Sequence, residues 1–390
     1  MRIAMLTNNY KPFVGGVPIS IERLADGLRN IGQEVYIFAP SYEDAEEEPF
    51  VIRYGSMKKK LNGELTIPKF AVSQLEKKFE DMNFDLIHVH HPVISGYIGC
   101  YIGWKYKIPV IFTHHTRYEQ YLHYFKKFNS KKLVLFHNRI FTNCCSMVFA
   151  PTPGIKTFLQ ENGTVSEIEV LPTGLLTKDY TYNDCEVEAL RKQYSPEGQR
   201  LFCTVSRLEK EKNISFLLDS LKVFKDRNGG QFRFLIIGEG TQKDSLRDRV
   251  VELGLVEQVV FLGSIPNHKI TSYYNVCDLF LFASTTETQG IVVLEAMAAG
   301  LPVIAVNATG VRDVLINGVN GYMTEENIYE WADRLGAVCN NHDIYVTMKV
   351  EAKAQALKYN EADIAKTALR YYQHAVTLKE MERSYEKKTI

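Results

Sequence analysis

Short apolar runs rich in β-branched residues alternate along the chain with longer segments in which apolar residues recur at helical spacing. This alternation predicts an α/β fold with parallel sheets, because parallel strands need a crossover, usually a helix, between them. The strand-like runs are 2–7, 34–40, 86–91, 109–114 and 147–152 in the first half, and 200–207, 232–240, 259–264, 279–284 and 302–307 in the second. Two such series predict two doubly wound, Rossmann-like domains.

The segment 173–186 is polar and lacks periodicity, so it predicts the boundary between the two domains. We therefore expect one domain over 1–175 and a second over 176–364, with a charged helix at about 365–390 that could pack back on the first. An amphipathic helix is expected at 19–32, ending on Gly32. Ligands of doubly wound sheets bind at the carboxyl ends of the strands, so two such domains facing each other predict a site in the cleft between them.

Composition narrows the class of protein. Apolar residues make up 45% of the 390 residues and charged residues 24%, as is typical of a soluble globular protein, and Lys+Arg equals Asp+Glu at 46 each. Seven cysteines without a C-x-x-C spacing argue against a disulfide framework or a structural zinc site. Because no apolar run reaches signal-peptide or membrane-span length, we expect a cytoplasmic protein that meets a membrane only from its surface.

Two segments have features of phosphate-binding loops. Gly15 and Gly16 lie between the first strand and the first helix, where glycines let backbone amides approach a phosphate; a tight turn would need the same pair. Arg207 leaves the end of a second-domain strand, and Lys212 follows five residues later. These two cations suit a diphosphate, although a solvated charged loop has the same composition.

The segment 286–304 has the strongest pattern. Glu287 follows an apolar strand, Gly290 opens the next helix with its free amides, and Glu295 lies eight residues after Glu287. Eight residues is a little over two helical turns, so if the helix starts near Gln289 both carboxylates could share a face and bind the hydroxyls of a sugar and a ribose. Either carboxylate alone would also suit a helix N-terminus or a buried helix face.

His114 and His115 end a strand of the first domain. Adjacent side chains on a strand point to opposite faces, so at most one of the two is expected to act, and either could be a hydrogen-bonded packing residue. No D-x-D or H-E-x-x-H motif supplies further ligands, so the sequence predicts no metal site.

Residues 51–160 contain sixteen Lys or Arg and six Asp or Glu, an excess of ten positive charges. Aromatic residues at helical spacing among lysines fit a helix lying on an anionic bilayer, although such a stripe is more often part of a core. The residues expected to face the membrane or its lipid are Tyr118, Tyr121, Phe125, Lys126, Lys127, Phe128, Lys131 and Lys132. No nucleic-acid-binding module accompanies the block, so a nucleic acid is not an expected partner.

Together these motifs resemble glycosyltransferase family 4, whose members are retaining enzymes of the GT-B fold. The resemblance rests on the GGV loop, the strand-end histidine, SRLEKEKN at 206–213, GEG at 238–240 and the two glutamates eight residues apart. More narrowly, HHTRYEQYLHY and TETQG are similar to bacterial 1,2-diacylglycerol 3-glucosyltransferases, which make membrane glycolipids from UDP-glucose.

The resemblance implies transfer of a hexose from UDP-glucose to diacylglycerol at the inner face of the cell membrane, without a metal or other cofactor. It implies catalytic roles for His115, Arg207, Lys212 and Glu287. The donor-binding residues that it implies are Gly15, Gly16, Gly238, Gly240, Ile265, Gln289, Gly290, Ile291 and Glu295. Gln289 stands where many family members have an aromatic or small residue, so the donor stays open.

Two other functions stay open on the sequence. One is a transferase acting on a soluble or polyprenyl-linked acceptor, or an epimerase, on the same fold. The other is a protein that binds nucleotide sugars without turnover. The set Arg207, Lys212, Glu287 and Glu295 argues against such a sensor, because a sensor has no need of leaving-group cations. Oligomeric state is not predicted.

Overall fold

The computed structural model describes residues 1–390 except 14, 43–44, 59–65, 69–70, 122–129 and 389–390. It divides into two compact units. Unit 1 comprises Met1–Gly174 and Glu361–Ile390, and unit 2 comprises Leu175–Asn360. The last segment of the chain therefore belongs to the same unit as the first.

Unit 1 is built on a seven-stranded parallel sheet of order β3-β2-β1-β6-β7-β8-β9. Its strands are β1 (Arg2–Leu6), β2 (Glu34–Pro40), β3 (Val51–Tyr54), β6 (Leu86–Val89), β7 (Val110–Thr113), β8 (Met147–Ala150) and β9 (Glu167–Val170). Its helices are α1 (Gly16–Asn30), α2 (Ala71–Met82), α3 (Ser95–Tyr106), η1 (Tyr118–Gln120), α4 (Lys131–Asn143), α5 (Pro153–Glu161) and α13 (Glu361–Lys388). A separate antiparallel pair joins β4 (Ser56–Lys58) to β5 (Thr66–Pro68).

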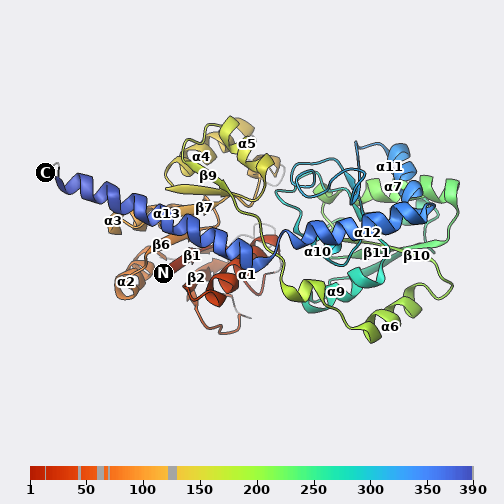
Figure 1. Cartoon of the computed structure of the whole chain (residues 1–390), viewed down its shortest axis with the longest axis horizontal. Helices are drawn as coiled ribbons and strands as arrows, with labels where there is room; N and C mark the ends of the chain where they lie inside the picture. The colour runs from red at the N-terminus through yellow and green to blue at the C-terminus, as the bar shows by residue number, and fades with distance from the viewer. Residues whose placement is uncertain (14, 43–44, 59–65, 69–70, 122–129, 389–390) are drawn as a thin grey trace. The chain divides into compact units, whose positions relative to one another are not determined.

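Alternate side chains of the unit 1 strands enter two different cores. On one face Leu6, Val89 and Phe112 pack with residues of α2, α3, α4 and α5. On the other face, neighbouring strand residues such as Met5 and Ile111 pack with α1 and α13. Figure 1 shows α13, in dark blue, lying beside α1, in red, although they come from opposite ends of the chain.

Unit 2 has a six-stranded parallel sheet of order β12-β11-β10-β13-β14-β15. Its strands are β10 (Arg200–Val205), β11 (Phe232–Ile237), β12 (Val259–Gly263), β13 (Leu279–Phe282), β14 (Val303–Val306) and β15 (Gly321–Thr324). Its helices are η3 (Thr177–Tyr180), α6 (Asp184–Tyr194), η4 (Lys210–Lys212), α7 (Ile214–Asn228), α8 (Lys243–Glu252), α9 (Asn267–Val276), α10 (Ile291–Ala298), α11 (Ile328–Cys339) and α12 (His342–Leu357).

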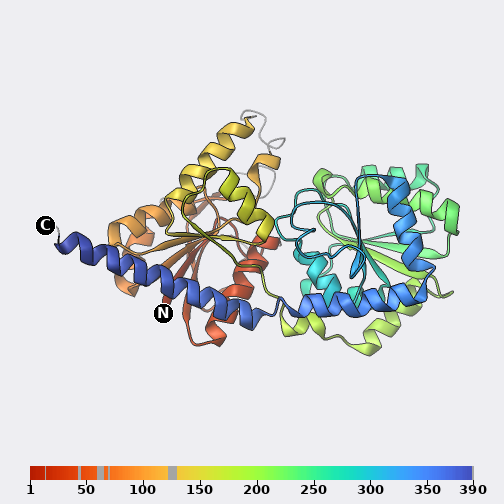
Figure 2. The ribbon, with the colours of Figure 1, turned by 45° about the horizontal axis from the view of Figure 1, so that its top comes forward.

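The unit 2 sheet is covered on both faces. Cys203 and Phe280 face a core completed by α9, α10 and α12. Phe202 and Leu281 face the opposite core, completed by α7, α8 and α11, with Trp331 of α11 fully buried. Figure 2 shows the strands of this sheet lying between the two helical layers. Both units are thus doubly wound α/β domains, as the sequence predicted.

Each of the ten runs that the sequence identifies as strands contains a strand of the structure. The strands that the sequence did not identify include β3, β9 and β15, which lie at sheet edges. Several of their residues are only partly buried, so they lack the continuous apolar runs of the central strands. The first helix begins at Gly16, three residues before the sequence placed it, and ends at Asn30, with the Gly32 amide donating to the Arg29 carbonyl.

All seven cysteines are free thiols. Among the helices in the described part of the chain, none is both long enough and apolar enough to cross a bilayer.

Candidate active site

In unit 2, predicted catalytic and donor-binding residues lie at the carboxyl ends of neighbouring strands. Arg207 follows β10, Gly238 follows β11 and Glu287 follows β13, and these three strands are adjacent in the sheet. Because parallel strands end at the same edge, residues distant in sequence come together there, at the usual ligand-binding edge of such sheets.

Lys212 and Glu287 form the closest charged pair of this edge, with Lys212 Nζ 2.5 Å from Glu287 Oε1. The Ser284 hydroxyl lies 3.5 Å from the same ammonium nitrogen. Both side chains of the pair are mostly buried, at 15% and 17% exposed. Burial would raise the pKa of Glu287, but the charge and hydrogen bond of Lys212 outweigh it and hold that pKa below its usual value. Glu287 is therefore ionised at neutral pH.

Arg207 is held by a different carboxylate. Its Nη2 lies 3.4 Å from Glu211 Oε1, and the Glu211 side chain is 3% exposed whereas that of Arg207 is 42% exposed. The Glu211 carbonyl also accepts a hydrogen bond from the Thr285 amide, in the loop that carries Glu287. Glu211 thus anchors a guanidinium group whose side chain stays partly exposed, so that it can meet an anion.

Gly238 and Gly240 allow the loop after β11 to approach the backbone next to Arg207. A Cβ at Gly238 would lie 1.8 Å from the Ser206 carbonyl oxygen, and one at Gly240 would lie 2.4 Å from the Leu208 carbonyl oxygen. The Leu208 amide donates to the Glu239 carbonyl at 2.9 Å. These glycines therefore fix the path of the backbone that presents Arg207; their predicted contact with the donor stays a prediction.

The helix α10 presents its first amides close to this edge. Gly290 is its N-cap in a left-handed conformation, with φ 72°, and Ile291 is its first residue. A left-handed cap suits glycine. The Val293 amide donates to the Gly290 carbonyl at 2.9 Å, whereas the amides of Ile291 and Val292 have no carbonyl one turn earlier in the helix. Gln289, just before the cap, is buried. Ile265, in the loop after β12, packs its side chain on the core and leaves its backbone for the predicted contact with a base.

Glu295 lies further along α10 and is 9% exposed. The Tyr274 hydroxyl of α9 donates to its Oε2 at 3.4 Å. Burial and the neighbouring carboxylate raise the pKa of Tyr274 well above its usual value, so the phenol stays a donor. The structure therefore brings Lys212 and Glu287 together and gives Arg207 and Glu295 separate partners.

In unit 1, histidines occupy the carboxyl ends of two adjacent strands. His90 and His91 follow β6, and His114 and His115 follow β7. The His91 Nδ1 atom accepts a hydrogen bond from the Asn8 amide at 3.2 Å, which ties the end of β6 to the end of β1. Burial lowers the pKa of His91 to about 4, so its ring is neutral at pH 7.

The two strand-end histidines of β7 have different surroundings. His114 is 1% exposed, and its ring lies against Phe112 and Phe158. His115 is only partly buried, and its Nε2 lies 2.9 Å from His90 Nδ1. The histidine that the resemblance selects is therefore the one in a polar contact, while its neighbour is surrounded by aromatic rings.

Gly15 and Gly16 open α1, with Gly15 as its N-cap. Gly15 is extended, at φ 179°, and a Cβ there would lie 3.0 Å from the Phe13 ring. The pair therefore occupies the strand-to-helix connection that the sequence predicted, and its phosphate contact stays a prediction.

The predicted membrane segment is described only at its two ends, because Phe125, Lys126, Lys127 and Phe128 lie outside the described residues. Tyr118 lies in η1, a single 3₁₀ turn that ends at Gln120, and Tyr121 caps that turn. The helix predicted to run on from Tyr118 is therefore wrong at its start. Lys131 and Lys132 begin α4 and are exposed.

Known proteins are similar to this chain in sequence and in fold. The family model "Glycosyltransferase Family 4" matches residues 14–178, and the model "Glycosyl transferases group 1" matches residues 186–355. The alpha-monoglucosyldiacylglycerol synthase of Acholeplasma laidlawii is 30% identical over 95% of this chain and 96% of its own.

The chain belongs to glycosyltransferase family 4.

The synthase of the same name from Streptococcus pneumoniae is also 30% identical to this transferase, over 78% of this chain and 71% of its own. HepE of Anabaena, solved with UDP and glucose, superposes with a TM-score of 0.79 at 20% identity, covering 96% of this chain and 100% of its own. Sucrose-phosphate synthase of Thermosynechococcus elongatus superposes with a TM-score of 0.79 at 17% identity, covering 97% and 100%. The transferase therefore has the GT-B fold.

Four residues of this family 4 glycosyltransferase that contact predicted site residues were not found by sequence reasoning: Ser284, Glu211, Tyr274 and His90. Glu211 lies within the charged motif, so its position directly before Lys212 was the available signal. The others contact residues far away in sequence, which no local pattern reports. Among the described residues, no group of three His, Cys, Asp or Glu side chains is arranged to hold a metal ion.

Proposed function

We propose that this glycosyltransferase moves glucose from UDP-glucose onto diacylglycerol, with retention of the anomeric configuration and without a metal ion. The observation that carries the proposal is the group of cations Arg207 and Lys212 at the carboxyl edge of the unit 2 sheet, beside Glu287. Two relatives that are 30% identical are alpha-monoglucosyldiacylglycerol synthases, which supports the lipid acceptor.

The chemistry follows from the charges of unit 2. As the bond between the anomeric carbon and the diphosphate oxygen breaks, its electron pair stays on the diphosphate, whose negative charge grows. Arg207, Lys212 and the first amides of α10 stabilise that charge in place of a metal ion. Glu287 is ionised and binds sugar hydroxyls, and Glu295 binds the ribose.

The acceptor step completes the exchange. The hydroxyl oxygen of diacylglycerol forms its new bond to the anomeric carbon from the face that the diphosphate leaves, and its proton passes to a diphosphate oxygen. His115 of unit 1 hydrogen-bonds the sugar near the reacting carbon, and Gly16 lies over the donor phosphates. Because the leaving group accepts the proton, the step needs no separate general base.

We also propose that unit 1 binds an anionic bilayer, and that its contact surface includes the outer faces of α3 and α4. Exposed apolar side chains recur at helical spacing on both helices. They are Tyr97, Tyr101 and Trp104 on α3, and Leu133, Phe136 and Ile140 on α4, with Trp104 78% exposed. Soluble proteins rarely expose a group of large apolar side chains without a partner for it.

These two faces adjoin and carry positive charge. The Tyr97 hydroxyl lies 2.9 Å from His137 Nε2, and the Tyr97 ring packs edge-on against Phe141, so α3 contacts α4 directly. Lys131, Lys132 and Arg139 are exposed on α4. Aromatic side chains among basic residues fit the interfacial layer of a membrane rich in anionic lipid.

Sedimentation with vesicles tests the membrane surface. We expect Trp104→Ser combined with Phe136→Ser to weaken binding to vesicles containing anionic phospholipid, and Lys131→Ser with Lys132→Ser to weaken it most at low salt. Val256→Ser, which removes an exposed apolar side chain of unit 2, is the control. Unchanged sedimentation of both double variants would rule out this surface.

The activity is tested with purified protein and a panel of nucleotide sugars, in the presence of vesicles with and without diacylglycerol. We expect UDP release with UDP-glucose that depends on diacylglycerol, and a product with the mass of a monoglucosyl lipid whose sugar linkage is α. Transfer only to soluble or polyprenyl-linked acceptors would replace the lipid assignment, and donor binding without UDP release under any condition would identify a sensor.

A further inference from the structure

His90 contacts His115, the histidine that the proposed function places at the sugar. His90 Nδ1 is 2.9 Å from His115 Nε2, and the two rings are nearly parallel, with an interplanar angle of 23°. The distance is that of an N–H···N hydrogen bond between the rings. The orientation of the His115 ring is therefore coupled to that of His90.

His90 is itself fixed within the core of unit 1. It is 1% exposed, its amide donates to the Leu6 carbonyl at 3.0 Å, and its ring centroid lies 4.2 Å from that of His88. His88 is hydrogen-bonded at both ring nitrogens, to the Thr113 hydroxyl and to the Tyr372 hydroxyl, each at 2.7 Å. Tyr372 belongs to α13, so the C-terminal helix holds the first ring in the row of imidazoles His88, His90 and His115.

Both members of the His90–His115 contact are neutral at physiological pH. Burial, reinforced by neighbouring imidazoles, lowers the pKa of each well below its usual value. A neutral imidazole carries one N–H, so one ring must donate and the other must accept across this contact. Fixing the proton of one ring therefore fixes the tautomer of the other.

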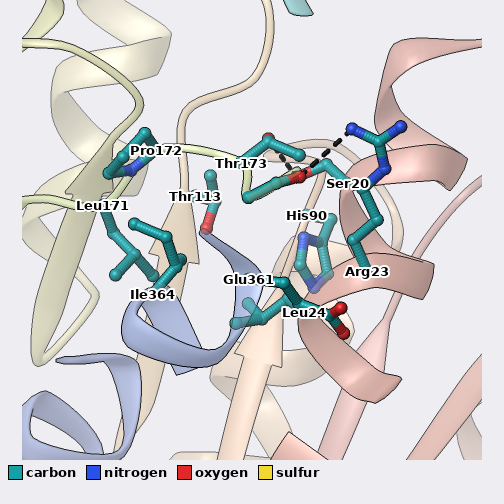
Figure 3. A pocket seen from close by; sticks show the side chains of 11 residues that line it. Ser20, Arg23, Leu24, His90, Thr113, Leu171, Pro172, Thr173, Glu361 and Ile364 are labelled. Carbon is teal, nitrogen blue, oxygen red and sulfur yellow. Dashed lines mark hydrogen bonds between the residues drawn. The ribbon is translucent and has the colours of Figure 1, made fainter. Parts of the chain in front are cut away.

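The surroundings of the other ring nitrogen of His90, Nε2, indicate which ring donates. His90 Nε2 is buried and has no hydrogen-bond partner among the described residues. It faces a small pocket, also lined by Ser20, Arg23 and Glu361, with room for about one water molecule (Figure 3). If His115 donated, His90 would carry its proton at Nε2, as a buried donor without a protein acceptor. Where no water in the pocket accepts that proton, an unpaired N–H is rarer in proteins than an unpaired acceptor, so donation by His90 is favoured.

We propose that His90 is a positioning residue for glycosyl transfer, which donates its Nδ1 proton to His115 and thereby holds His115 as the tautomer protonated at Nδ1. His115 then presents an N–H donor to a sugar oxygen rather than a bare nitrogen. This role rests on the proposed function of His115, whereas the contact itself does not.

Nitrogen NMR of the full-length protein, labelled in its 10 histidine rings, tests the contact without any substrate. The wild type is expected to show His115 with a pyrrole-type Nδ1 and a pyridine-type Nε2. His90→Phe removes the donor, so the His115 signals should shift as its tautomers mix. A pyrrole-type Nε2 on His115 in the wild type, or His115 signals unchanged by His90→Phe, would overturn the proposal.

Kinetics separate positioning from a merely structural role. We expect His90→Phe to lower kcat about tenfold or more with little change in the KM of the nucleotide sugar, because the hydrogen bond that it removes orients a reacting group. His90→Asn puts an amide donor near the position of Nδ1 and is expected to recover much of the lost rate. His114→Phe is the control for a buried strand-end histidine, since the His114 ring lies among aromatic side chains.

The two proposals fail in different ways. If the wild type transfers no sugar from any donor, the proposed function fails while the NMR result still decides the contact. If transfer occurs and folded His90→Phe keeps the full kcat, the positioning role fails and the proposed function stands. Circular dichroism and thermal melting establish that each variant is folded before it is scored.

Discussion

At the carboxyl edge of its sheet, unit 2 carries charged side chains, whereas unit 1 carries neutral imidazoles. In unit 2, Lys212 and Glu287 face each other at 2.5 Å and Arg207 is held by Glu211. In unit 1, His115 is held by His90, and burial keeps both rings neutral. The same sheet architecture thus provides two different chemical environments.

The difference follows what each edge is proposed to bind. A diphosphate leaving group gains charge during the reaction, so the groups beside it need fixed positive charge. A sugar hydroxyl stays neutral, and a neutral hydrogen-bond donor can orient it without bringing a second cation near the reacting carbon. If so, the charged groups of unit 2 should govern donor binding and leaving-group stabilisation, and the neutral imidazoles of unit 1 should govern the position of the sugar.

The largest effect is expected from the cations of unit 2. We expect Arg207→Ala and Lys212→Ala each to lower kcat by about two to three orders of magnitude, because each removes a group that stabilises the leaving diphosphate. The measurement is UDP release at saturating donor. Lys222→Ala, which removes a lysine paired with Asp226 on the surface of α7, should retain the wild-type rate. Full activity of Arg207→Ala would refute the assignment.

The second-largest effect is expected in the pH at which each unit loses stability in acid. Burial lowers the pKa of His88 to about 3 and those of His91 and His114 to about 4. Since the folded values lie below the unfolded value of about 6.5, these rings stabilise unit 1 above that pH, and the stabilisation is lost as the pH falls toward 4. Each such histidine changes the free energy of unfolding by about 1.4 kcal/mol per pH unit within this window.

Unit 2 should lose stability only at lower pH, when its Lys212–Glu287 ion pair is broken by protonation of the carboxylate. The pKa of Glu287 is lowered in the fold, so the Lys212–Glu287 pair contributes stability above the unfolded value of about 4.3 and loses it only below that. The unfolded pKa of histidine, about 6.5, is higher than that of glutamate, about 4.3. As the pH falls, unit 1 should therefore begin to open between about pH 6 and pH 5, before unit 2 does. Peptide-resolved hydrogen exchange, corrected for the intrinsic effect of pH, measures this order. Simultaneous opening of both units would contradict the comparison.

A smaller effect is expected where α13 supports the histidines. Tyr372→Phe removes the hydroxyl bonded to His88 Nδ1 and leaves that buried nitrogen without its partner. We expect a loss of about 1–2 kcal/mol in the free energy of unfolding, measured with urea. Tyr385→Phe, at an exposed position of the same helix, is the matched control. No loss in Tyr372→Phe would mean that the phenol does not stabilise the row of imidazoles.

No effect is expected from chelation. Because the cations of unit 2 are proposed to replace a metal ion, transfer should proceed at the same rate with and without EDTA. Loss of transfer in EDTA that added Mg²⁺ or Mn²⁺ restores would show that the charge on the diphosphate is balanced by a metal.

The sequence predicts the fold well where burial is complete. The central strands β1, β6, β10 and β13 are nearly continuous apolar runs, because both of their faces are covered by helices. The edge strands β3, β9 and β15 are exposed on part of their surface, so their residues resemble those of loops and the pattern does not identify them.

For the candidate site, the sequence indicates which residues to consider but not which of them are in contact. Arg207, Lys212 and Glu287 stand in local motifs, and their residue types indicate their chemistry. The pairing of Lys212 with Glu287 spans 75 residues and depends on β10 lying next to β13, and that of Tyr372 with His88 spans 284 residues and depends on the packing of α13. Such contacts follow from tertiary topology, which no local pattern encodes.

Titration of UDP into the purified protein tests the division between the two units most directly. The account predicts that Arg207→Ala weakens UDP binding at least about tenfold, since a charge-assisted hydrogen bond is lost. It also predicts that His115→Asn leaves the UDP affinity unchanged while lowering the rate of transfer. Equal UDP affinity in Arg207→Ala and wild type, or a loss of UDP affinity in His115→Asn as large as that in Arg207→Ala, would contradict it.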